Sequence, residues 1–217
     1  MENEELDFRT PEFWEHRYRT GKTGWDLGRP APPLVSFVRG NRERLPAGKA
    51  VVLGCGRGHD ARFLAWEGWE VLGVDVSALA VQEAERLAQA EGLSRVRFLR
   101  ADLFALPEEW AGAFDLALEH TCFCAIDPAR REEYARAVAT LLRPGGAFLG
   151  LFFTVLPEDG PPFPTSQEEL EALFSRYFTV EEAYTPLDSH PERRGRELLM
   201  LFRRRGSLVG GAVSERG

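Results

Sequence analysis

The 217-residue chain has few cysteines and lysines, and no apolar run long enough to cross a membrane. Its three cysteines, Cys55, Cys122 and Cys124, are too few for a disulfide framework and wrongly spaced for a structural zinc site. Lysine occurs only at Lys22 and Lys49, with arginine in its place. No signal peptide opens the chain, so we expect a cytoplasmic protein with no metal and no membrane partner.

The chain also has no basic stripe. Its formal net charge is −7, and charges of both signs are mixed along it. This pattern argues against a nucleic-acid partner. Two arginine clusters stand out, one at Arg193, Arg194 and Arg196 and one at 203–205, and we interpret them as a solvated loop and the end of a strand.

The length suits a single α/β domain. We expect that domain over residues 1–205, with an N-terminal lid segment at 10–46, a core at 47–205 and a flexible tail at 206–217. The oligomeric state does not follow from the sequence.

What the chain does contain is a nucleoside-binding unit at residues 50–77. An apolar run ends in glycines at every second position, Gly54, Gly56 and Gly58. A helical pattern and a second apolar run follow, and the second run ends in Asp75. In such a strand–loop–helix–strand unit the glycines let the backbone approach a ligand, and the carboxylate accepts hydrogen bonds from ribose hydroxyls.

The glycine spacing narrows the choice of nucleoside. A dinucleotide fingerprint needs glycine at position 59, where His59 stands, and no Walker lysine follows the loop. A loop of this kind suits a ligand without a pyrophosphate, and S-adenosylmethionine is the leading candidate. A tight turn in an ordinary α/β protein is the alternative.

Three aromatic residues precede this unit. Trp14 and Tyr18 lie one helical turn apart, and Trp25 lies in the Gly/Pro-rich loop beyond. They are either packing residues or a lid whose rings attract the cofactor's sulfonium cation, and the sequence favours neither interpretation.

Further elements follow along the chain. A helix begins at Thr10-Pro11, and Ser77 and Ser166 are expected to cap two others. We predict helices at 34–38, 77–92, 130–142 and 167–177, strands at 96–99, 114–118, 147–153, 178–184 and 197–202, and a proline-rich loop at 154–164 that shapes a substrate mouth.

Polar residues follow two of these strands. Asp102, which follows the third strand, would lie beside the adenine ring and accept a hydrogen bond from its exocyclic amine. Glu119 could bind the amino group of the methionine moiety. His120 is either a proton acceptor for a neutral thiol or a hydrogen-bonding partner of the cofactor or of nearby backbone. Cys122 and Cys124 are expected to pack under the site.

The chain resembles a class I S-adenosylmethionine-dependent methyltransferase of the thiopurine S-methyltransferase family, and within it the plant-type halide, thiocyanate and thiol methyltransferases. The segments that carry the resemblance are FWEHRYRTGKTGWDLGRPAP, LGCGRGHD, GVDVS, FDLALEHTCFCAIDP, LLRPGG and DGPPF. Together they span most of residues 12 to 203, and WDLGRPAP is far more specific than the glycine loop.

The resemblance implies a doubly wound, Rossmann-like sheet of seven strands with the last strand antiparallel. It implies that Trp14, Tyr18 and Trp25 contact the cofactor, with Tyr18 replacing the usual tryptophan. It also implies that Gly54, Gly56 and Asp75 form the cofactor loop and ribose site, and Asp102 with Leu103 the adenine site. His120 stands where halide and thiol relatives usually carry a tyrosine that faces the transferred methyl group.

We therefore expect in-line methyl transfer to a soft sulfur or halide nucleophile in a dry pocket built by Trp14, Trp25 and Phe123. S-adenosylhomocysteine would be the leaving product. The alternatives are methylation of another small molecule, a metalloid, a protein or a nucleic acid, and a non-catalytic S-adenosylmethionine-binding protein.

Overall fold

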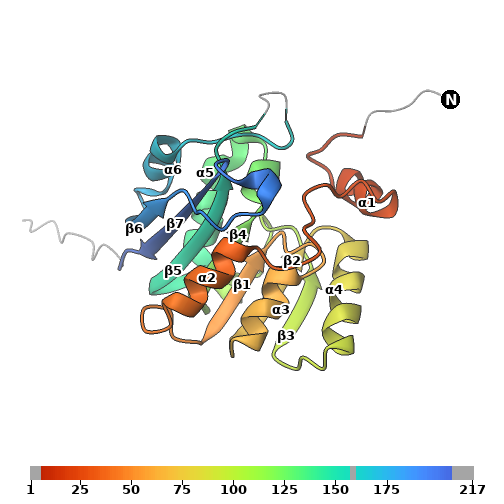
Figure 1. Ribbon diagram of the computed structural model, residues 1–217, viewed down its shortest axis with the longest axis horizontal. Coiled ribbons are helices and arrows are strands. Elements are labelled where there is room, and N and C mark those ends of the chain that lie inside the picture. Colours follow the sequence, from red (N-terminus) through yellow and green to blue (C-terminus); the bar gives the residue numbers. More distant parts are fainter. Residues whose placement is uncertain (1–5, 157–159, 207–217) are drawn as a thin grey trace, which may run out of the picture.

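The computed structural model describes residues 6–156 and 160–206, which form one mixed sheet flanked by helices (Figure 1). The seven strands lie in the order β3-β2-β1-β4-β5-β7-β6. Neighbours from β3 to β5 are parallel, whereas β7 runs antiparallel to both β5 and β6. This confirms the sheet that the resemblance implies. The strands are β1 (Lys49–Leu53), β2 (Glu70–Asp75), β3 (Val96–Arg100), β4 (Phe114–His120), β5 (Leu142–Phe153), β6 (Phe178–Tyr184) and β7 (Glu197–Arg204).

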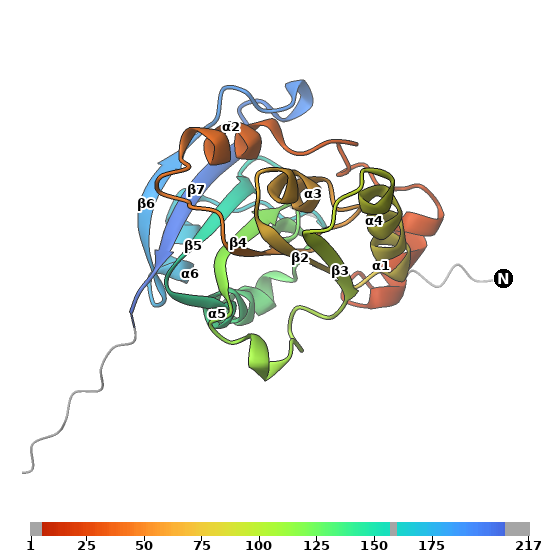
Figure 2. The same ribbon diagram turned by 90° about the horizontal axis from the view of Figure 1, so that it is seen from below.

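Helices cover both faces of the sheet (Figure 2). α2, α3 and α4 pack on one face, and α5 and α6 on the other. The α-helices are α1 (Pro11–Arg19), α2 (Pro32–Gly40), α3 (His59–Trp66), α4 (Ala78–Ala90), α5 (Arg131–Leu141) and α6 (Gln167–Phe174). Short 3-10 turns are η1 (Glu108–Trp110), η2 (Phe123–Ala125), η3 (Pro128–Arg130) and η4 (Pro191–Arg193).

The middle of each central strand is mainly apolar because both of its faces are buried. In β1, Ala50 and Val52 belong to the core beneath α2 and α3, whereas Val51 and Leu53 belong to the core beneath α5 and α6. Successive side chains of a strand point to opposite faces, so one short run serves both cores. The same alternation decides which residues at the end of β4 reach the site.

Two helices begin at the serines that the sequence predicts as their caps. Ser77 Oγ accepts a hydrogen bond from Ala80 N at 3.2 Å, and Ser166 Oγ accepts one from Glu169 N at 3.1 Å, so both serines cap their helices. α2 begins two residues earlier than expected, at Pro32. Proline is well suited to the first turn of a helix, because a backbone N–H at that position would have no partner within the helix. α6 ends at Phe174, short of the predicted 177.

The N-terminal segment 10–46 has two unlike halves. No residue of α1 is fully buried, whereas Leu34, Phe37 and Val38 of α2 belong to the core. Within this segment α1 and the loop after it border the site, and α2 covers the sheet. Of the predicted flexible tail, only Gly206 lies within the described residues. No helix in the described part of the chain is both long and apolar enough to span a bilayer.

Gly58 at the start of α3 yields a stability prediction. Its φ is +72°, and a Cβ there would lie 2.6 Å from the Phe98 ring. We expect Gly58→Ala to lower the free energy of unfolding by about 2–4 kcal/mol, from backbone strain and overpacking together. The measurement is urea unfolding of the purified protein.

Gly92→Ala is the matched control for that substitution. Gly92 has φ +68° but nothing within 4 Å of a Cβ. Gly92→Ala should therefore lower the free energy of unfolding by about 1 kcal/mol, from backbone strain alone. Equal losses in the two variants would contradict the packing that we describe around Gly58.

Candidate active site

A cavity of about 560 Å³ opens at the carboxyl ends of the central strands. β1 ends at Leu53 beside Val74 of β2 and Glu119 of β4, so three strand ends meet there. Open α/β sheets bind ligands at this edge. The predicted site residues that line the cavity are Trp14, Tyr18, Trp25, Gly54, Gly56, Asp75, Asp102, Leu103 and His120.

The glycine loop and Asp75 form one hydrogen-bonded unit. Gly56 N donates to Asp75 Oδ2 at 2.8 Å, and Ser77 N donates to Asp75 Oδ1 at 2.9 Å. Burial raises the pKa of Asp75, which these backbone donors partly oppose. At Gly56, with φ +53°, a Cβ would lie 2.9 Å from the Tyr18 hydroxyl. Glycine is therefore required at this position, where φ is positive and the Tyr18 hydroxyl approaches the backbone closely.

Helix α1 is tied to this unit from above. Glu15 Oε2 accepts hydrogen bonds from Ser77 Oγ at 2.7 Å and from Leu79 N at 3.3 Å. This carboxylate stands at the N-terminus of α4, where a negative charge is favoured. It places the aromatic residues of α1 at the mouth of the cavity.

The three aromatic residues form one cluster. Trp25 packs edge-to-face on Trp14 and on Tyr18, with ring centroids 5.6 and 5.7 Å apart. Trp14 Nε1 donates to the carbonyl oxygen of Phe8 at 2.8 Å, which fixes the indole. Burial raises the pKa of Tyr18, so its phenol stays neutral. The rings of the cluster border the cavity beside the glycine loop.

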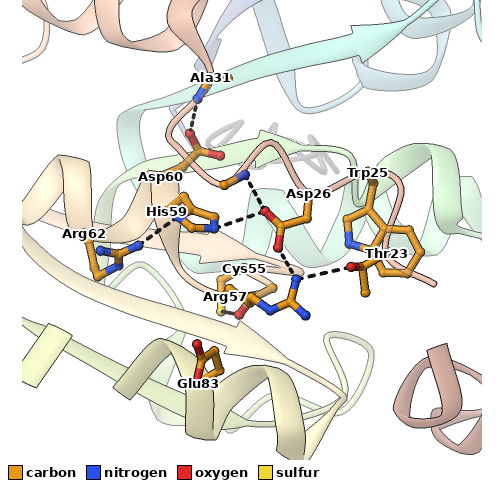
Figure 3. Close-up of polar contacts among 12 residues, drawn as sticks. Thr23, Trp25, Asp26, Ala31, Cys55, Arg57, His59, Asp60, Arg62 and Glu83 are labelled. Atoms are coloured by element: carbon orange, nitrogen blue, oxygen red, sulfur yellow. Dashed lines mark hydrogen bonds and ion pairs between the residues drawn. The ribbon is translucent and has the colours of Figure 1, made fainter. Parts of the chain in front are cut away.

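Asp26 holds the loop that carries Trp25 (Figure 3). Its carboxylate accepts from Gly28 N at 2.7 Å, lies 3.1 Å from His59 Nε2 and is ion-paired with Arg57. Burial tends to raise the pKa of Asp26, but hydrogen bonds from His59, Gly28 and Arg57 outweigh it and lower the pKa well below its usual value. The carboxylate therefore stays charged and joins the loop to α3.

Asp60 makes a second attachment to this segment. Its Oδ1 accepts from Ala31 N at 2.8 Å, and its Oδ2 lies 2.8 Å from His120 Nδ1. Arg193 NH1 lies 2.9 Å from His120 Nε2, and Arg193 NH2 donates to the Trp25 carbonyl oxygen at 2.5 Å. A guanidinium has only donors, so Nε2 must accept, and the imidazole proton lies on Nδ1 and points at Asp60.

Several of these residues have no role in the predictions made from the sequence. Asp26, His59 and Asp60 fall inside the quoted segments WDLGRPAP and GRGHD, and their partners become visible only in three dimensions. The interpretation of Arg193 as part of a solvated loop is wrong, because it is 7% exposed and lies 3.6 Å from Glu197. A buried arginine needs such partners.

Glu119 does not reach the cavity, which corrects its prediction as a cofactor ligand. It is 1% exposed, and its carboxylate accepts from Cys122 N, Phe123 N and the Tyr134 hydroxyl. Because side chains alternate along β4, Glu119 faces α5 while His120 faces α3. Its carboxylate closes the turn after the strand.

Phe123 is likewise not a wall of the substrate pocket. It is 1% exposed and packs against Tyr134, Phe152 and Phe174 in the core beneath α5 and α6. The wall on the β4–β7 side consists instead of Phe153, Leu156, Pro161, Pro162, Glu192, Arg193 and Arg196. Residues 157–159 of the predicted mouth loop lie outside the described residues.

The remaining predicted residues lie at the cavity edge. Asp102 Oδ1 accepts from Phe104 N at 2.9 Å, which turns the chain after β3 and orients the carboxyl group. Cys122 and Cys124 are buried, and burial raises the pKa of Cys124 to about 12, so it is a neutral thiol. Residues 6–156 and 160–206 hold no group of three or more His, Cys, Asp or Glu that could bind a metal ion.

Comparison with known proteins agrees with this geometry. A family model described as thiopurine S-methyltransferase matches residues 9–204. A probable thiol methyltransferase 2 of Arabidopsis thaliana is 36% identical over 162 residues, 74% of this chain and 70% of that protein. Thiocyanate methyltransferase 1 of the same plant is 33% identical over 193 residues, 86% of this chain and 82% of that protein.

A solved structure shares the fold. The 1,6-didemethyltoxoflavin-N1-methyltransferase of Burkholderia thailandensis, crystallised with S-adenosylhomocysteine, superposes with a TM-score of 0.72 at 23% identity. The alignment covers 90% of this chain and 87% of that one. The fold and the relatives define a methyltransferase of the class that uses S-adenosylmethionine. The chain belongs to the thiopurine S-methyltransferase family.

The attachment through Asp26 predicts a local effect of Asp26→Asn. The substitution removes the charge that Arg57 and His59 share, so the loop at 23–31 should open more often. We expect its backbone amides to exchange hydrogen roughly ten times faster, since losing a charge-assisted hydrogen bond costs about 1.5 kcal/mol. Hydrogen exchange read by mass spectrometry measures this.

Asp115→Asn is the control. Asp115 also accepts from a backbone N–H, that of Lys49 at 2.8 Å, and pairs with Arg143, but it does not line the cavity. We expect it to leave exchange at 23–31 unchanged. The same exchange rates there in Asp26→Asn and in the unmodified protein would show that the carboxylate does not hold the loop.

Proposed function

We propose that the chain transfers a methyl group from S-adenosylmethionine to a small soft nucleophile, such as a thiolate, thiocyanate, a halide or a thiopurine-like sulfur. The observation that carries the proposal is the aromatic cluster standing beside the Gly56–Asp75 unit. A nucleoside site and a surface that attracts cations are thereby combined in one cavity.

The cofactor fits the residues present. Asp75 would accept from the ribose hydroxyls, and Asp102 with Leu103 would border the adenine. Gly54 and Gly56, which line the cavity, would border the amino-acid moiety, while Trp14, Tyr18 and Trp25 would face the sulfonium. When bound, the cofactor supplies an electrophilic methyl group on a positively charged sulfur.

The acceptor would lie on the β4–β7 side of the cavity. The apolar part of its wall is formed by Phe153, Leu156, Pro161 and Pro162. The charged part has two guanidiniums, of Arg193 and Arg196, and one carboxylate, of Glu192, so positive charge is in excess. A positive charge and a dry wall favour an anion, because water no longer screens the attraction between opposite charges. Alignment and exclusion of water are then the protein's main contributions, and the names of the thiol and thiocyanate methyltransferase relatives support the same acceptor class.

Turnover of methyl-labelled S-adenosylmethionine tests the proposal. The purified protein is offered thiocyanate, iodide, an aliphatic thiol, an aromatic thiol and a thiopurine, with an alcohol, an amine, a protein mixture and RNA as comparison acceptors. We expect product from sulfur or halide acceptors only. Label transfer to the comparison acceptors alone would overturn the acceptor class, and no heat of binding with S-adenosylmethionine would overturn the cofactor.

The geometry of His120 predicts how its removal acts. Its Nε2 already accepts from Arg193, so we propose that His120 orients Arg193 and is not a general base. His120→Phe should lower kcat/KM for thiocyanate, which has no proton to lose, and for a neutral thiol by the same factor, on the order of tenfold. The measurement is the ratio of kcat/KM for thiocyanate to kcat/KM for the neutral thiol, followed across pH.

A base role gives a different result. In that case His120→Phe would lower the turnover of the neutral thiol and leave the turnover of thiocyanate unchanged. The loss of thiol turnover would become smaller at a pH high enough for the thiol to ionise without a base. His16→Phe, on α1 and outside the cavity lining, serves as the control.

A further inference from the structure

We infer that Arg17 binds the carboxylate of the cofactor's amino-acid moiety, an inference that rests on the proposed function. S-adenosylmethionine carries an ammonium and a carboxylate besides its sulfonium. Burying that carboxylate requires a cation or several hydrogen-bond donors. The identity of this partner is a question separate from the ribose and adenine contacts.

Arg17 is a cation held at the cavity with its donors unused. It lines the cavity from α1, and its Nε is buried without a hydrogen-bond partner among the described residues. Its guanidinium lies over the rings of Phe13 and Trp25, at 5.8 and 5.5 Å from their centroids. The guanidinium is planar by delocalisation, and stacking on the aromatic rings leaves its N–H edge available to an anion.

Most other cavity-lining arginines already have partners. Arg57 is bound to Asp26, Arg193 to His120 and the Trp25 carbonyl, Arg130 to Glu133 and Arg9 to Asp7. Arg29 is exposed, and Arg196 lies on the β4–β7 side with the proposed acceptor wall. Near the glycine loop, Arg17 is the cation with free donors in the described part of the chain.

The position of α1 favours the cofactor carboxylate over the acceptor. Glu15 ties the helix to the end of β2, and Tyr18, next to Arg17, reaches Gly56. The helix therefore stands over the cofactor side of the cavity. Trp14 Nε1 is committed to the carbonyl of Phe8, so this indole cannot serve the carboxylate. Arg17 offers the five N–H donors of a guanidinium in its place.

Calorimetry with two ligands tests the inference. The probes are S-adenosylhomocysteine and its analogue with hydrogen in place of the carboxylate. The unmodified protein should bind S-adenosylhomocysteine roughly 10- to 100-fold more tightly, as expected for a charge-assisted hydrogen bond. In Arg17→Met this ratio should fall below about threefold, and Arg17→Lys should keep part of it.

Arg19→Met is the matched control, because Arg19 lies on the same helix, is exposed and does not line the cavity. It should leave the ratio unchanged. Circular dichroism and thermal melting establish that each variant is folded.

Each other outcome has a definite meaning. If Arg17→Met weakens both ligands equally, Arg17 only supports the cluster, and the inference is overturned. If the ratio holds while KM for thiocyanate rises, Arg17 binds the acceptor, which also overturns it. If the unmodified protein binds neither ligand, the proposed function fails first, and the inference fails with it.

Discussion

The structure depends on two partly buried, paired carboxylates, Asp26 and Asp60, that hold an N-terminal loop on the edge of the sheet. Asp26, next to Trp25, accepts from Gly28 N, and Asp60 of α3 accepts from Ala31 N of the same loop. A buried carboxylate is costly unless it is paired, and here each one has a histidine together with backbone N–H donors. These pairs make the aromatic cluster part of the cavity wall.

The same network couples the two halves of the cavity. His120 lies at the end of β4, between Asp60 of α3 and Arg193 of η4. Arg193 in turn holds the carbonyl of Trp25. The cofactor side and the proposed acceptor side therefore share one chain of hydrogen bonds, in which the imidazole acts as donor to a carboxylate and acceptor from a guanidinium. A substitution at any member is expected to disturb the others.

Much of the fold follows from local patterns. The glycine spacing, the acid after β2, and the serines that cap α4 and α6 each have a local physical cause, and the elements begin near the expected residues. Nine of the predicted site residues line one cavity, because parallel strands bring their carboxyl ends to a common edge. The two predictions that are wrong concern Glu119, which points to the opposite face of β4 from His120, and Phe123, which lies in the turn η2 and packs in the core.

Residue order was sufficient to predict most of the individual strands and helices, the glycine loop with its carboxylate, and the motifs whose resemblance to a known family implied the sheet. These depend on hydrophobic period, backbone conformation and short motifs, all of which are local. Tertiary contacts decided that His120 faces the cavity while Glu119 closes a turn, and that Arg193 is buried instead of solvated. The physical reason is that burial and hydrogen-bond partners come from segments far apart in the chain, such as Trp25 and Arg193, which only the closed fold brings together.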